Sequence, residues 1–200
     1  MSITSYQAAY YIGLKTDWQT TRQRLHNLLF IAQMAYAFDN NGESLISNEG
    51  FYADDTGPTL RKIDEHISCY GARPYQDLFR RFEKKEIDSP EIKLLDQILE
   101  SFQYTPTYHL FKQTRGYAWS KYYQKGYLKY RISQKDITIQ GIIVFGKRSE
   151  LVLLNNAICD TANFTAENIE LGILSDKTVN PYSMSEQEKQ IVNTILEKYG

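Results

Sequence analysis

The sequence has few of the features that mark a secreted or membrane-spanning protein. Its 200 residues include only two cysteines, Cys69 and Cys159, which lie far apart and fit no metal-binding or redox spacing. We therefore expect two buried thiols in a reducing cytosol. The apolar runs, such as residues 142–145, are far shorter than the roughly 20 residues that cross a bilayer. Residues 1–11 lack the basic and apolar regions of a signal peptide, so we expect a cytoplasmic protein.

The chain also lacks a strong charge of one sign and any local signature of catalysis. Its net charge is -1, and it has neither a Gly-rich phosphate loop nor the Gly-x-Ser-x-Gly turn of a hydrolase. Among its histidines we expect His26 to pack, His66 to join a solvated charge cluster, and only His109 to merit a test of chemical function. The neighbouring Asp54 and Asp55 suit a turn better than a cation site. We therefore expect no cofactor, no metal and a binding protein instead of an enzyme.

Hydrophobic residues make up 42% of the chain, which is enough for a packed core. In the first two-thirds of the sequence they recur at helical spacing. Asp17 is expected to cap a long helix that ends at Asn40-Asn41-Gly42, because Asn and Gly tolerate the left-handed conformation. Residues 45–53 are expected to be extended, and Pro58 to occupy the first turn of the next helix. The expected helical segments are residues 6–12, 17–40, 60–70, 75–85, 90–102 and 106–113.

The pattern changes after Gly126. β-branched and aromatic residues at 137–145 and 150–155 favour two strands joined by a turn at 146–149. Residues 156–182 are ambiguous, whereas a capping box and an apolar stripe predict a last helix over 185–199. The fold class expected is mainly α, a helical domain with a small β-hairpin-containing C-terminal insert and a closing helix (α+β overall). We divide it into a helical domain, 1–130, and a strand-containing extension, 131–200.

A basic and aromatic stretch is the clearest surface feature of the sequence. Residues 112–148 contain nine basic side chains and a single acidic one, Asp136, with tyrosines and a tryptophan between them. Such a stretch suits a protein partner, because Arg, Tyr and Trp dominate interface hot spots, or a nucleic acid, through phosphate contacts and base stacking. It could equally be neutralised within the molecule. The residues predicted to contact a partner are Tyr117, Trp119, Lys121, Tyr122, Tyr123, Lys125, Tyr127, Lys129 and Arg131.

Several short motifs follow one another in a distinctive order. They are Tyr6-Gln-Ala-Ala-Tyr-Tyr-Ile, the string from Arg24 to Gln33, Phe51 to Thr59 with its Gly-Pro, the Leu95–Phe102 helix, Leu110 to Thr114, and Trp119. Taken together, these motifs resemble the Panacea domain, also called the SocA-like or phage-associated GepA-like domain, over about residues 4–123. Three positions depart from the usual pattern: Asn27 before the paired leucines, Thr56 before Gly-Pro, and Arg115 where histidine normally follows threonine.

The resemblance implies a mostly helical fold found in bacteria, phages and mobile elements. Members of that family serve as antitoxins that neutralise toxins by direct contact, or as adaptors that hand a toxin to a protease. We therefore expect a protein-binding module whose partner is a toxin or a host protein. A nucleic-acid-binding regulator and a phage inhibitor of a host defence protein are the alternatives. Leu28, Leu29, Gly57 and Pro58 are expected to determine the fold and not to contact the partner.

Overall fold

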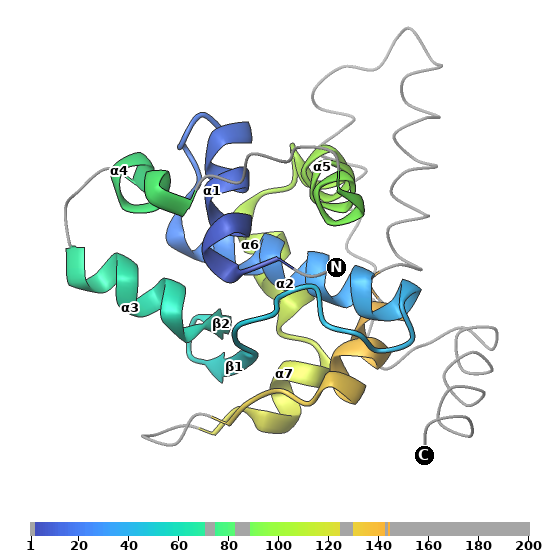
Figure 1. The fold of residues 1–200 in the computed structure, drawn as a ribbon. Coiled ribbons are helices and arrows are strands. Elements are labelled where there is room, and N and C mark those ends of the chain that lie inside the picture. Colours follow the sequence, from blue (N-terminus) through green and yellow to red (C-terminus); the bar gives the residue numbers. More distant parts are fainter. Residues whose placement is uncertain (1–2, 71–74, 83–88, 125–129, 143, 145–200) are drawn as a thin grey trace, which may run out of the picture. The chain divides into compact units, whose positions relative to one another are not determined.

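The computed structural model describes residues 3–70, 75–82, 89–124, 130–142 and 144 (Figure 1). The chain divides into two compact units, Met1–Gly141 and Ile142–Gly200, and nearly all described residues belong to the first. The expected domain boundary after residue 130 stays a prediction. The expected strand over 150–155 and the expected helix over 185–199 lie outside the described residues.

The first unit is mainly helical with one small antiparallel sheet, which confirms the expected fold class. Residues 134–142 are helical as well. In the part of the chain that is described, no helix is both long and apolar enough to cross a membrane. The labelled helices are α1 (Ser5–Lys15), α2 (Arg22–Asp39), α3 (Arg61–Tyr70), α4 (Tyr75–Phe79), α5 (Pro90–Phe102), α6 (Thr107–Thr114) and α7 (Tyr117–Tyr122), with a 3-10 turn, η1 (Arg80–Phe82), after α4.

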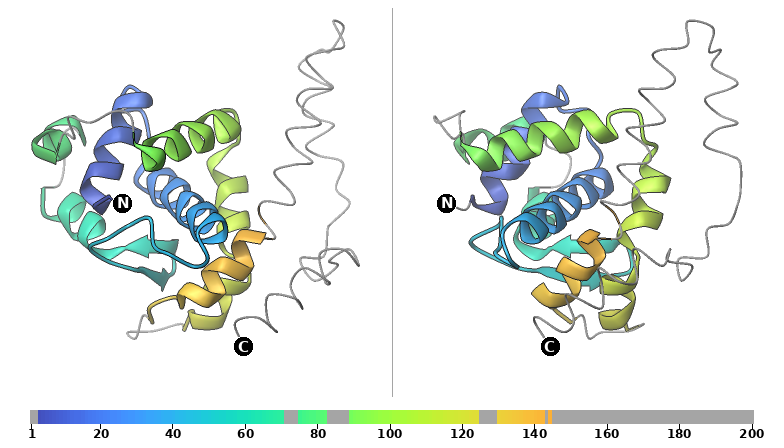
Figure 2. Two further views of the ribbon diagram at one scale, coloured as in Figure 1. Left: turned by 45° about the vertical axis from the view of Figure 1, so that its right-hand side comes forward. Right: turned by 90° about the vertical axis from the view of Figure 1, so that its right-hand side faces the viewer.

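Helix α2 is the centre of the fold. Every residue from 25 to 37 is buried, so the helix is covered on all sides and not along one stripe. It contacts α1, α5, α6 and the sheet, and both views of Figure 2 show it between α5 and the strands. Leu28 and Leu29 lie at its core, with almost no exposed surface.

The ends of the first helices follow local capping rules. Thr4 and Gln7 form a capping box at the start of α1. Helix α2 begins after Thr21, whose hydroxyl accepts the Arg24 N–H, so the prediction that Asp17 caps this helix is wrong. Asp17 instead has a positive φ of 47° and lies in the connection before α2. The predicted stop at Asn40-Asn41-Gly42 is confirmed.

The sheet is a hairpin of β1 (Phe51–Asp54) and β2 (Gly57–Leu60), in which Pro58 lies opposite Ala53. The prediction that Pro58 starts a helix is therefore wrong, and α3 begins only at Arg61. Gly57 has a φ of 106°, which turns the chain back along β1, and proline is tolerated in an edge strand. The other edge of β1 pairs with residues 130–132 through Ala53 and Ile132 N–H groups.

Residues 134–142 form a helix, so the strand predicted for Ile137 and Ile139 is wrong. The side chains of Asp136 and Gln140 are buried with them, which breaks the alternation that a strand needs. Close packing explains Gly141, where an added Cβ would lie 2.7 Å from the Met34 carbonyl oxygen of α2.

Two further expectations about α3 are wrong. Cys69 is exposed, not buried. His66 lies half-buried among the rings of Tyr6, Phe79 and Phe82, with Nε2 2.9 Å from the Leu78 carbonyl oxygen, and not in a solvated cluster. The apolar neighbours come from α1, α4 and η1, which are distant in sequence, so the local acidic residues alone suggested the wrong environment.

Candidate partner-binding surface

Helix α7, within the basic and aromatic stretch, is held against the tip of the hairpin. The Trp119 indole N–H donates to the Asp54 carbonyl oxygen at 2.9 Å, and the Tyr123 hydroxyl donates to the Asp55 carboxylate at 2.9 Å. The Trp119 and Tyr123 rings stack on each other, with centroids 4.2 Å apart. Asp55 N–H also bonds the Asp54 carboxylate, which is the turn role expected for this acidic pair. These contacts fix the direction of α7.

Asp136 neutralises part of the basic stretch. Its carboxylate, almost fully buried, accepts the Lys121 ammonium at 3.1 Å and a short hydrogen bond from the Tyr122 hydroxyl. The hydrogen bond to Asp136 raises the pKa of Lys121. Burial, followed by the same carboxylate, raises the pKa of Tyr122. Lys121 and Tyr122, which were both predicted to contact a partner, therefore also help to pack the helix over 134–142.

Cations lie over aromatic rings along α6 and α7. The Arg115 guanidinium is 4.0 Å from the centre of the Phe111 ring and 4.5 Å from that of Trp119. Lys112 lies 4.7 Å from the ring centre of Tyr108. Each partner pair is four residues apart, which places both members on one helix face or across the α6–α7 corner. A cation over the face of an aromatic ring is attracted to it by about 0.5–1 kcal/mol at exposed sites.

Three tyrosines of this region remain open to solvent. Tyr104, in the turn between α5 and α6, is 87% exposed, whereas Tyr108 at the start of α6 is 59% exposed and Tyr117 at the start of α7 is 45% exposed. We call residues 104–123 the aromatic segment. Only Tyr117 was predicted from the sequence as a contact residue. Tyr104 and Tyr108 were missed, although the spacing of Tyr108 and Lys112 was a readable signal of one helical face.

The remaining predicted contact residues lie elsewhere. Lys125, Tyr127 and Lys129 are outside the described residues. Arg131 packs on the backbone of Gly50, where an added Cβ would meet its Nε at 2.1 Å. The structure thus gathers the predicted contact residues from Tyr117 to Tyr123 on α7 and its C-terminal end, and it places Arg131 at the edge of β1.

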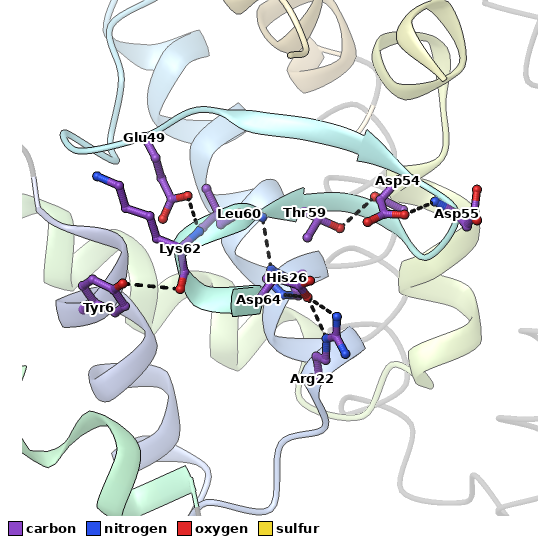
Figure 3. A network of polar contacts seen from close by, with 11 residues as sticks. Tyr6, Arg22, His26, Glu49, Asp54, Asp55, Thr59, Leu60, Lys62 and Asp64 are labelled. Atoms are coloured by element: carbon purple, nitrogen blue, oxygen red, sulfur yellow. Dashed lines mark hydrogen bonds and ion pairs between the residues drawn. The ribbon is translucent and has the colours of Figure 1, made fainter. Parts of the chain in front are cut away.

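A polar network that runs from buried His26 to exposed Arg22 supports the hairpin from the side of α2 (Figure 3). His26 Nδ1 accepts the Leu60 N–H at 3.3 Å, so the hydrogen of the neutral ring sits on Nε2, which faces the Asp64 carboxylate at 3.4 Å. Arg22 Nε donates to the same carboxylate at 2.7 Å. Burial alone would raise the pKa of Asp64, but His26 and Arg22 together lower it below its ordinary value. His26 is nearly fully buried, which agrees with the packing role expected for it.

Beneath the hairpin, Asn27, which departs from the Panacea pattern, meets Thr114, which is one of the positions that carry the resemblance. The Thr114 hydroxyl of α6 donates to the Asn27 side-chain oxygen of α2 at 3.0 Å, and both residues are completely buried. Gly57 lies over this pair, since a Cβ there would be 3.6 Å from the Asn27 oxygen. Histidine at 109 lies one helical turn earlier, with its ring 5.8 Å from that of Tyr108.

Comparisons with protein-family models, with curated proteins and with solved structures find no match for this chain. The resemblance to the Panacea domain therefore stays a prediction that rests on its motifs.

Proposed function

We propose that the chain is a protein-binding module of the antitoxin or proteolytic-adaptor type, acting in the cytoplasm by direct contact with a toxin. The observation that carries the proposal is the exposure of Tyr108 and Tyr117 on helices that are themselves anchored, with Tyr104 exposed in the turn before α6. Tyrosine supplies a large contact area with few rotatable bonds, so a ring presented by a fixed helix loses little entropy on binding. Interface hot spots are rich in such residues.

The order of motifs supports the same proposal independently of the surface. The resemblance points to bacterial mobile elements and phages, where such modules neutralise toxins. A phage inhibitor of a host defence protein would use the same surface and the same kind of contact. The two differ only in the partner, which the adjacent gene would reveal.

The arrangement of charge favours a protein over a nucleic acid as the partner. Lys121 is paired with Asp136, and Asp54 and Asp55 lie beside the stacked rings of Trp119 and Tyr123. A carboxylate at that place repels a phosphate backbone, which would need several unpaired cations to bind.

Co-expression tests the proposal. The product of the adjacent gene is expressed with the wild-type chain, with Tyr108→Ala plus Tyr117→Ala, or with Leu14→Ala, a control that truncates a side chain 50% exposed on α1. We expect the wild type and the control to relieve toxicity and to co-purify with the product, and the double variant to fail in both. No rescue by the wild type would contradict the proposal. Binding of DNA or RNA that weakens steeply with salt would favour the regulator instead.

A further inference from the structure

A cavity of about 290 Å³ lies away from the aromatic segment. Three parts of the chain form its wall: α2, the residues that lead into β1, and residues 131–137, which follow on its other edge. Its volume is at the lower end of the range, roughly 300 to 1,000 Å³, that small-molecule sites occupy. Its wall combines apolar side chains with one fully buried amide, the half-buried amide of Gln134 and two opposite charges.

The fully buried amide belongs to Gln33, which is only 1% exposed. Its side-chain oxygen accepts the Ile46 N–H and the Ser44 hydroxyl, each at 3.1 Å, so the orientation of the amide is fixed. The NH2 group is then left buried with no hydrogen-bond partner among the described residues. Because an unpaired buried donor costs free energy, this group marks a place for an acceptor that the chain itself does not supply.

The two charges are Glu49 and Arg131, which line the same cavity. One carboxylate oxygen of Glu49 accepts the Lys62 N–H at 2.9 Å, whereas the other is buried without a partner. Arg131 is held in place on Gly50, which has no side chain to displace it. Over the described ranges no ion pair joins Arg131 to Glu49. One acidic and one basic side chain thus border the same small cavity without forming an ion pair with each other.

We propose that this cavity binds a small zwitterion of the α-amino-acid type with an apolar side chain. Arg131 and the Gln33 amide bind the carboxylate, and the unpaired oxygen of Glu49 binds the ammonium group. These are the charge-assisted contacts that each group favours. The apolar wall takes the side chain of the ligand through Phe51, Ile132 and Ile137. The site is separate from the protein-binding surface and does not depend on it.

Titration calorimetry of the full chain tests the site with L-leucine, L-valine and L-methionine. N-acetyl-L-leucine lacks the ammonium group and L-leucinamide lacks the carboxylate, so each removes one end of the zwitterion. We expect saturable binding of at least one free amino acid and a loss of about tenfold or more in affinity for both derivatives, since each loses a charge-assisted contact.

Variants locate the binding. Arg131→Gln and Glu49→Gln each remove one charge, and Glu49→Gln keeps an oxygen for the Lys62 N–H. Both are expected to lose about tenfold or more in affinity. The control for Arg131→Gln is Lys135→Gln, which removes a positive charge from an exposed residue outside the cavity wall and is expected to bind as the wild type does. Circular dichroism shows that each variant is folded. No binding of any amino acid, or binding that Arg131→Gln leaves unchanged, would show that the cavity is not an amino-acid site and would overturn the proposal.

Discussion

The hydrogen bond between Thr114 and Asn27 offers a sharp test of how the hairpin, α2 and α6 are held together. In Thr114→Val the hydroxyl is replaced by a methyl group of similar size, so the packing changes little. The Asn27 oxygen then has no donor, and its NH2 group already lacks a partner among the described residues. A fully buried amide would be left with both polar ends unsatisfied.

The cost of such a change is the desolvation of the orphaned oxygen, about 1–3 kcal/mol. With a urea m value of roughly 2 kcal/mol per molar, the midpoint of unfolding should fall by about 0.5–1.5 M. Asn27→Leu should cost less, because Leu has no polar group to satisfy and the Thr114 hydroxyl keeps its second acceptor, the Phe111 carbonyl oxygen at 3.3 Å.

The double variant decides between this account and simple packing. Replacing both partners of a buried hydrogen bond by apolar groups of the same shape is nearly neutral, so Asn27→Leu should restore much of the stability that Thr114→Val removes. Thr107→Val on the same helix, at a half-buried position, is the control and should change stability by less than about 0.5 kcal/mol. Losses that simply add in the double variant, or a neutral Thr114→Val, would refute the reasoning.

Three further predictions concern the hairpin and its supports. Gly57→Ala should destabilise the fold by about 1–2 kcal/mol through its positive φ alone, because the added Cβ meets nothing closer than 3.6 Å; a neutral result in urea unfolding would contradict this. The pKa of Asp64 in the folded protein lies below its ordinary value of 3.8, so the ionised carboxylate stabilises the fold at pH values above 3.8. This stabilisation is lost as the pH falls through the folded-state pKa. Asp64→Asn should thus be less stable at neutral pH and approach the wild type in acid, and a gap that persists in acid unfolding curves would argue against it. Trp119→Phe removes the bond to the Asp54 carbonyl oxygen and should cost about 0.5–1.5 kcal/mol by urea unfolding, and an unchanged midpoint would show that this bond does not hold α7.

Local signals in the sequence predicted the parts of the fold that depend on neighbouring residues. The stop at Asn40 to Gly42 and the helix expected over 90–102 are such parts, and both are confirmed, the second as α5 with Pro90 in its first turn. Pro58 misled because proline suits the first turn of a helix and an edge strand equally well. Only the pairing with Ala53, on a strand that precedes it, decides between them.

Dependence on contacts with distant residues also explains why the helix over 134–142 and most of the candidate surface were not predicted from the sequence. The alternation at Ile137 and Ile139 predicted a strand, but Asp136 and Gln140 are buried because residues of α7 bind them. The cavity joins Gln33, Glu49 and Arg131, which are far apart in the chain, and no spacing in the sequence connects them. The cations four residues from aromatic rings on α6 and α7 were, by contrast, open to prediction.

The central claim is that the aromatic segment binds a protein partner. The most direct measurement is the dissociation constant of the purified chain for the product of the adjacent gene, compared with that of the variant carrying both Tyr108→Ala and Tyr117→Ala. Truncation of a hot-spot residue costs about 2 kcal/mol or more, so the account predicts a loss of affinity of roughly thirtyfold or more, while Leu14→Ala binds as the wild type does. Equal affinity of the wild type and the double variant would contradict it.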